Sequence, residues 1–262
     1  MTKGRLCLVV LTALTGALAF SAPALAGGTP EWFECVKQKG GSYEKGCAAE
    51  GGKGGYIARP GLGTGTFHAF AAKATIGGPR NAITCAMSIE GTKVAPNLVT
   101  GVTITLKVCS RADDSKDHCE AQETKGPKET TLESEPLQGE LGYIGHSPLH
   151  VGLKLANVAD PGGPIFTRIY CIGPTAHFIF SGGSVVGEIH GAVNASSAKS
   201  TLAYVPGDYL GEGEPEVNPP LEGEPAGTLV EEIQTAKEVF GEPLPTSISG
   251  SLKIVGAQMI RA

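Results

Sequence analysis

Runs of β-branched and apolar residues, separated by short turn-forming segments, recur along most of the chain. The clearest runs are GTFHAFAAKATI (65–76), AITCAMSIE (82–90) and LVTGVTITLKVCS (98–110). The segments between them, GGPR and GTKVAPN, contain the Gly, Pro and Asn residues that favour turns. We therefore predict consecutive β-strands in this part of the chain.

The second half of the chain continues the pattern. GELGYI (139–144) and HVGLKLANV (150–158) flank the segment GHSPL and predict a hairpin. Further strands are expected in PIFTRIYCI (164–172), AHFIFSGGSVVGEIHGAV (176–193), which divides at Gly182-Gly183, STLAYV (200–205) and TSISGSLKIVGAQMI (246–260). Strands at this spacing predict an all-β fold, a single antiparallel β-sandwich or barrel-like domain.

One segment has the pattern of a helix. In residues 228–242 the apolar positions Leu229, Ile233, Ala236 and Phe240 roughly follow helical spacing, and a glycine near the end is a natural stop. A strand followed by a loop is the alternative for this segment.

The first residues have the order of an export signal. Lys3 and Arg5 precede an apolar run (6–20), and Ala24-Leu25-Ala26 supplies the small residues of a cleavage site. The run is shorter than the roughly 20 residues that a membrane-spanning helix needs. We predict a signal peptide at 1–26, a disulfide-stapled N-terminal arm at 27–60, and a β domain at 61–262. The mature chain is expected to be secreted, without a transmembrane segment.

Six of the seven cysteines lie after the predicted signal peptide. An even number in an oxidising compartment predicts three disulfides, although six cysteines allow 15 pairings. Neither the C-x-x-C spacing of a redox pair nor the close pairs of a zinc ribbon is present. From the segments that separate them we expect the pairs Cys35–Cys47, Cys109–Cys119 and Cys85–Cys171.

Charge is unevenly distributed. The chain carries a formal net charge of −5, and residues 206–242 hold ten acidic residues against the single basic Lys237. No concentrated basic surface is visible, which argues against a nucleic-acid partner. In the Pro/Glu-rich loop at 206–227, residues 211–227 include too few apolar side chains to bury the surface that an ordered structure needs. We expect a solvated loop there, and the alternative is an acidic arm that meets cations or a basic partner.

Several residues approach a catalytic or metal-binding pattern without completing it. Ser147 lies in GHSPL, which lacks the final Gly of a nucleophile elbow and precedes a strand instead of a helix. His146 and His150 are four residues apart, but the turn between them argues against one helix face. The loop DDSKDH, with Asp113, Asp114, Asp117 and His118, lacks the alternating oxygens and bend glycine of a calcium loop.

Glu188 and His190 are two residues apart on a predicted strand, so their side chains share one face. With Glu140 they could form the carboxylate pair of a glycosidase, although the sequence does not set their separation. We assign no catalytic, cofactor-binding or metal-binding residue and expect no cofactor.

Several short elements occur together in this chain: Pro30-Glu31-Trp32 with Cys35, Gly41-x-Tyr43 before Cys47, Gly51-Gly52-Lys53-Gly54 with Tyr56, and the hairpin PLQGELGYI (136–144) with VGLKL (151–155). In these elements, and over most of its length after the predicted signal peptide, the chain resembles a family of uncharacterised secreted proteins from high-GC Gram-positive (actinobacterial) soil bacteria. The resemblance implies secretion and a mainly β domain. It carries no activity and therefore no functional residue.

We expect a secreted, non-catalytic binding or structural protein of the cell envelope or extracellular space. The alternative is an extracellular, glycosidase-like hydrolase that uses Glu140, Glu188 or His190 in a β-sheet groove. A third hypothesis is cation binding by the acidic arm. The sequence does not identify the partner, and a cell-envelope component is the candidate.

Overall fold

The computed structural model describes residues 28–47, 54–61, 65–77, 82–111, 118–121, 131–160, 163–166, 169–171, 176–181, 183–194, 196–207, 210, 217–225, 229–235, 239–256 and 258–262. The predicted signal peptide lies outside these residues, as do 112–117 and 211–216. The described chain consists of β-strands and one 3₁₀ turn, Lys45–Cys47. The all-β prediction is confirmed.

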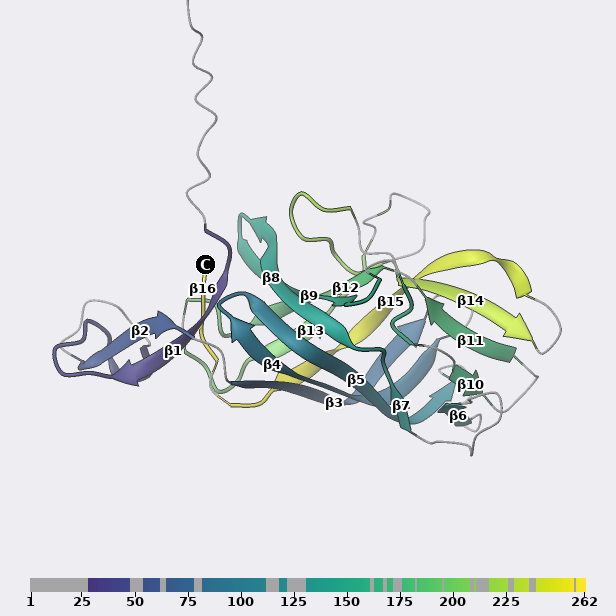
Figure 1. Cartoon of the computed structure of the whole chain (residues 1–262), viewed down its shortest axis with the longest axis horizontal. Coiled ribbons are helices and arrows are strands. Elements are labelled where there is room, and N and C mark those ends of the chain that lie inside the picture. Colours follow the sequence, from purple (N-terminus) through teal and green to yellow (C-terminus); the bar gives the residue numbers. More distant parts are fainter. Residues whose placement is uncertain are drawn as a thin grey trace, which may run out of the picture.

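Eight antiparallel strands close a barrel in the order β13-β12-β9-β8-β5-β4-β3-β15, and β15 pairs with β13 to complete it (Figure 1). The strands are β3 (Thr66–Gly77), β4 (Ile83–Ala95), β5 (Leu98–Arg111), β8 (Leu137–His146), β9 (Leu149–Asn157), β12 (Ser184–His190), β13 (Thr201–Tyr204) and β15 (Val239–Ile254). The predicted hairpin at 139–158 is β8–β9, and the predicted division near Gly183 separates β11 (Ala176–Ser181) from β12.

The long strands of the barrel continue into a second closed ring. β15 pairs with β14 (Leu229–Thr235), which is followed by β11, β10 (Ile169–Cys171) and β6 (His118–Ala121), and β6 returns to β5. β5, β4, β3 and β15 therefore belong to both rings. β7 (Thr131–Glu133) pairs with β5 beside this junction. Figure 1 shows β14, β11, β10 and β6 grouped on the side away from the N-terminal arm.

Burial follows the two-residue period of a strand. In β4 the side chains of Ile83, Cys85, Met87 and Ile89 are buried, whereas the residues between them are partly exposed. Antiparallel sheets commonly have this one-sided pattern, because one face packs on the core and the other meets water. The core is the set of inward-facing side chains from both rings.

The N-terminal arm forms a small sheet of its own. β1 (Glu31–Lys37) pairs with β2 (Tyr56–Pro60) and with β16 (Ile260–Arg261), so both ends of the described chain meet there. The predicted Cys35–Cys47 disulfide closes the arm. Trp32 is 2% exposed, and its ring lies 5.9 Å from that of Phe67 in the barrel core. The arm is thus pinned to the barrel by its one tryptophan.

The other two predicted disulfide pairings are wrong. Cys85 pairs with Cys109, and Cys119 pairs with Cys171. The four cysteines lie on the neighbouring strands β4, β5, β6 and β10, and Cys119 is opposite Cys109 on one side and Cys171 on the other. At a bulge in β5, Val108 and Cys109 together face Cys85, and Val108 adopts a φ of +52°. The order of the strands and this bulge determine which cysteines pair. The length of the loop between two cysteines does not determine it.

The helix expected at 228–242 is also wrong, and its alternative, a strand, is present as β14. β14 pairs with β11 on one edge and with β15 on the other. Both edges of the segment are therefore satisfied by sheet hydrogen bonds, which outweigh a weak local preference for helix.

Three disulfides are typical of proteins that fold in an oxidising compartment. Among the described residues, no helix has the length and hydrophobicity required to cross a membrane.

Candidate functional site

Histidine and glutamate side chains gather on the outer face of β8, β9 and β12. In the β9–β12 pair Glu188 lies opposite Gly152, and Val186 lies opposite Lys154. Because side chains two residues apart on a strand share a face, this register puts His150, Glu188 and His190 on one surface.

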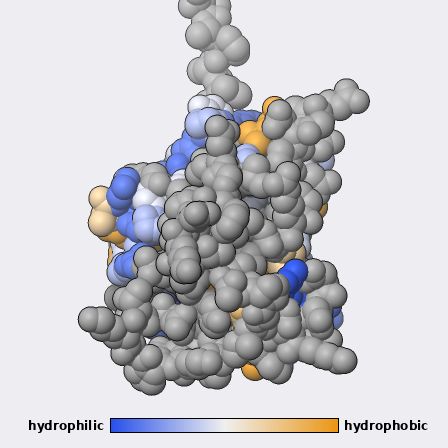
Figure 2. Space-filling model, turned by 90° about the vertical axis from the view of Figure 1, so that its right-hand side faces the viewer, coloured by the Kyte–Doolittle hydropathy of each residue, from blue (hydrophilic) through white to orange (hydrophobic). Residues whose placement is uncertain are grey.

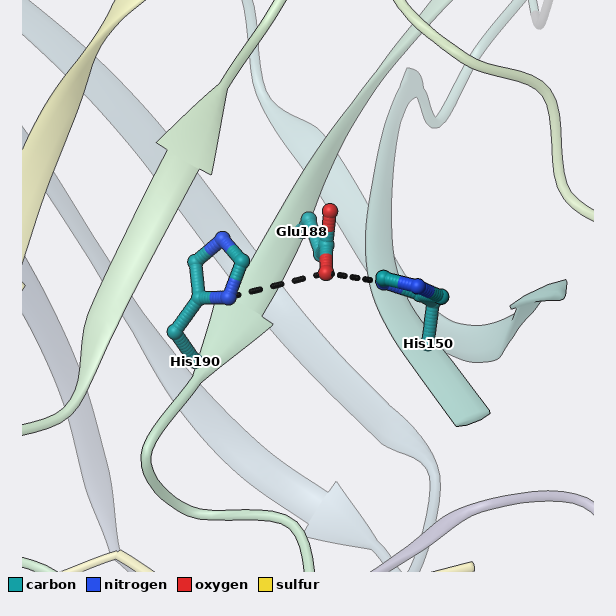
Figure 3. Close-up of polar contacts among 3 residues, drawn as sticks. All are labelled: His150, Glu188 and His190. Atoms are coloured by element: carbon teal, nitrogen blue, oxygen red, sulfur yellow. Dashed lines mark hydrogen bonds and ion pairs between the residues drawn. The ribbon is translucent and has the colours of Figure 1, made fainter. Parts of the chain in front are cut away.

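The two imidazoles converge on one carboxylate oxygen. His150 Nδ1 hydrogen-bonds Glu188 Oε1, and His190 Nδ1 lies 3.5 Å from the same oxygen. Figure 3 shows the rings on either side of the carboxylate and its second oxygen pointing away from both. The side chains of His150, Glu188 and His190 are 38%, 21% and 51% exposed, so the cluster is held in place yet open to solvent.

A second histidine–glutamate pair lies at the end of β8, next to the β8–β9 turn. His146 Nε2 is 2.9 Å from Glu222 Oε2, and the His146 ring lies 4.2 Å from the ring of Tyr143. The Tyr143 hydroxyl donates to the carbonyl of Gly28 at 2.9 Å. Partial burial, and then the charge of Glu222, raise the pKa of Tyr143. We call His146, His150, Glu188 and His190 the histidine rim.

Residues 217–225, which we call the strap, lie across this face of the barrel. Leu221 packs on Gly142, where a Cβ atom would come within 2.5 Å of Leu221 Cδ1, so a larger residue at 142 would displace the Leu221 side chain. The Glu222 N–H donates to the Tyr143 carbonyl at 2.7 Å, and Lys154 Nζ contacts Glu224 at 2.7 Å. These contacts fix the strap next to the histidine rim.

Asn218 joins the strap to β15. Its side-chain amide donates to the Ile248 carbonyl and accepts from the Ile248 N–H, both at 2.8 Å, and Asn218 is 2% exposed. The expectation of a solvated loop is therefore wrong for Val217–Leu221, where four of the five side chains are buried. It fits the exposed residues Glu222–Pro225.

The remaining sequence candidates do not assemble into a catalytic set. Ser147 lies in the two-residue turn between β8 and β9, and β9 follows it in place of the helix that an elbow requires. Glu140 lies opposite Lys154 on β8, with β9 between it and Glu188. Two strand spacings amount to about 10 Å between their backbones. The structure thus brings Glu188 and His190 together with His150, but not with Glu140.

Within the ranges given above, no group of three or more His, Cys, Asp and Glu residues is arranged to hold a metal ion. Asp113, Asp114 and Asp117 lie outside those ranges, and His118 is described only as part of the β6 backbone. The carboxylates of Glu222 and Glu224 face His146 and Lys154, so these two acidic residues already have cationic or imidazole partners.

Sequence reasoning missed one feature of this face and one feature elsewhere in the fold. The glycine at 142 and the apolar Leu221 gave no signal that they would pack together, since about 80 residues separate them. It also missed Lys93, which lies in a cleft at the base of the N-terminal arm.

Comparison of the chain with family models, with curated proteins and with solved structures finds no match in any of the three.

Proposed function

We propose that the chain is an exported, non-catalytic binding protein of the cell envelope or extracellular space, and that it binds through the histidine rim. The observation that carries the proposal is the convergence of His150 and His190 on one oxygen of Glu188, which leaves the other oxygen pointing away from both rings (Figure 3). We infer a polyhydroxylated ligand, a carbohydrate of the envelope.

The chemistry of the rim favours hydroxyl groups. A carboxylate oxygen accepts hydrogen bonds, and each imidazole offers a nitrogen that donates or accepts. Because the side chains already hold one another, little conformational freedom is lost on binding. The rings of Tyr143 and His146, 4.2 Å apart, add an apolar surface beside the polar groups.

The location outside the cytoplasm is supported by two independent features. The three disulfides need an oxidising compartment to form and persist. The N-terminal sequence has the charge, apolar run and small-residue site of a signal peptide.

Co-sedimentation of the oxidised protein with purified cell envelopes tests the proposal. Removal of 211–227 is a poor perturbation, because it deletes Asn218 and Leu221 together with the acidic residues. The sharper variants are Glu188→Gln and His190→Gln, which keep side-chain size. We expect each to reduce bound protein at least about tenfold, the scale of losing one hydrogen bond to a charged group.

The chain offers a matched control. His68 on β3 and Glu90 on β4 form a cross-strand pair with the same chemistry, 3.6 Å apart, away from the rim. Glu90→Gln should leave envelope binding unchanged. Equal loss in Glu90→Gln and Glu188→Gln, or binding that survives both Glu188→Gln and His190→Gln, would overturn the assignment to the rim.

A hydrolase that uses the same cluster is the second candidate. The hydrogen bond between His150 and Glu188 favours it, because an imidazole–carboxylate pair can move a proton. Screening on polysaccharide and ester substrates, with Glu188→Gln as the comparison, decides between the two. Turnover that disappears in Glu188→Gln would replace the binding proposal with this one.

A further inference from the structure

A cleft of about 420 Å³ lies between the N-terminal arm and the barrel. Strand β1 forms one wall of the cleft. The start of β3 and the end of β4 form a second wall, and residues 258 and 259, just before β16, close the cleft. The lining residues include Glu34, Thr66, Lys93, Ser196, Gln258 and Met259. The cleft shares no residue with the histidine rim, and its volume is within the range of small-molecule sites.

Lys93 is held in this cleft by a buried amide. Gln258 is 6% exposed, its Nε2 donates to the Val255 carbonyl at 3.0 Å, and its Oε1 accepts from Lys93 Nζ. The backbone of Gln258 is fixed by two hydrogen bonds of 2.9 Å with Ser197. Lys93 Nζ also lies 4.3 Å from the centre of the Trp32 ring. The amine is thus positioned by neighbours that carry no charge.

Lys93 has no carboxylate partner within 4.0 Å in the described chain. The carboxylate whose charge acts on it is Glu34, but Glu34 Oε2 lies 3.5 Å from Arg59 on β2. Burial lowers the pKa of Lys93 to about 8, and Glu34 opposes this shift only in part. The other groups that face Lys93 from the cleft walls, Thr66 on β3 and Gln258 before β16, are neutral.

A lysine that is desolvated, positioned and without a counter-ion has the features of a nucleophilic amine. At neutral pH such a group has a neutral fraction about two orders of magnitude larger than that of an ordinary lysine, whose pKa is about 10.4. The lone pair of the neutral amine is what attacks a carbonyl carbon, and the open cleft provides the space for that carbonyl.

We propose that Lys93 binds a small aldehyde or ketone in this cleft as a Schiff base. Lys93 Nζ adds to the carbonyl carbon, and a carbon–nitrogen double bond replaces the carbon–oxygen double bond. The two amine hydrogens leave with the carbonyl oxygen as one molecule of water. The step is neither an oxidation nor a reduction, and the imine is reversible.

Trapping with a simple aldehyde tests this directly. The oxidised full-length protein is incubated with glycolaldehyde and sodium cyanoborohydride, which reduces an imine to a stable secondary amine, and modified lysines are located by peptide mass mapping. Lys73 and Lys253 are exposed lysines of the same barrel and serve as internal references. We expect Lys93 to be modified at least about tenfold faster than either at pH 7.5, given its larger neutral fraction.

Two variants connect the rate to the geometry. Gln258→Glu places a counter-charge at the amine with little change in shape and should slow the modification of Lys93 while Lys73 is unchanged. Glu34→Gln removes the one acidic group that acts on Lys93 and should accelerate it. Modification of Lys93 at or below the rate of Lys73 and Lys253 would overturn the proposal, as would a rate that is insensitive to Gln258→Glu.

Discussion

The contact that ties the strap to the barrel, Asn218 to Ile248, gives the sharpest stability prediction. On one edge Ile248 pairs with Ile76 of β3. On its other edge, Thr246 faces the first residue of β14 and Gly250 faces the last residue of β13, and no described strand pairs with residues 247–249 between them. The Asn218 amide fills this gap in the ladder with its two hydrogen bonds of 2.8 Å. Asn218→Ala therefore leaves a buried N–H and a buried C=O without partners.

Each unsatisfied buried group costs about 1–3 kcal/mol. With some relaxation of the strap, we expect Asn218→Ala to lower the free energy of unfolding by about 2–4 kcal/mol. For a domain of this length that corresponds to a fall in Tm of about 6–12 °C. Thermal unfolding followed by far-ultraviolet circular dichroism measures the loss, and hydrogen exchange of the Ile248 amide locates it.

Two controls separate the possible causes. Asn218→Leu keeps the bulk of the side chain and should be destabilised to a similar degree, because the hydrogen bonds and not the packing carry the effect. Gln138→Ala removes an exposed amide on β8 and should change stability by less than about 0.5 kcal/mol. A Tm of Asn218→Ala within 1 °C of the wild type, with the Ile248 amide still protected, would refute the reasoning.

Val108→Gly should raise the free energy of unfolding by about 1 kcal/mol, because a β-branched residue is strained at a φ of +52°. The control Val94→Gly, at another exposed strand position, should lower the free energy of unfolding, and urea unfolding measures both changes. Burial lowers the pKa of Lys93 to about 8, so above that pH the unfolded chain binds more protons than the folded protein. The free energy of unfolding of the wild type, relative to that of Lys93→Met, should therefore rise by about 2 kcal/mol between pH 7 and pH 9.5 in urea titrations. A difference that stays constant over this range would contradict the burial of Lys93. Replacement of both Cys35 and Cys47 by serine should weaken the arm by about 2–3 kcal/mol, seen as faster proteolysis near the 3₁₀ turn with the barrel intact; an unchanged cleavage rate would mean that Trp32 alone holds the arm.

Much of the barrel could be predicted because its signals are local. The strands at 66–77, 83–95 and 98–111 and the β8–β9 hairpin are each specified by β-forming residues between turn residues, which are neighbours in the sequence. Cys35–Cys47 was predicted for the same reason, since 12 residues separate the pair. Short separation was not sufficient by itself: Cys109 and Cys119 are similarly close in the sequence, yet Cys109 pairs with Cys85 and Cys119 with Cys171.

The rest could not be predicted because it depends on contacts between segments that are far apart in the sequence. Cys119 and Cys171 are 52 residues apart and meet only because β6 and β10 are neighbours in the second ring. Leu221 is buried only because Gly142 leaves space on the outer face of β8. Lys93 is desolvated only because the arm and the segment before β16 pack over the end of β4. None of these neighbours is encoded in the residues that flank them.

The barrel contains two histidine–glutamate contacts that can be compared directly, His68–Glu90 and the Glu188 cluster of the histidine rim. His68 and Glu90 show that a histidine–glutamate pair can lie across two strands as an ordinary surface contact, with the glutamate 66% exposed. Glu188 differs because it is only 21% exposed, receives two imidazoles on one oxygen, and lies on the face that the strap covers in part. A single contact would be enough to tie β9 to β12. The second imidazole adds little to strand pairing, but it fixes the direction of the remaining carboxylate oxygen. That difference is what Glu188→Gln and Glu90→Gln measure when they are compared in the same envelope-binding assay.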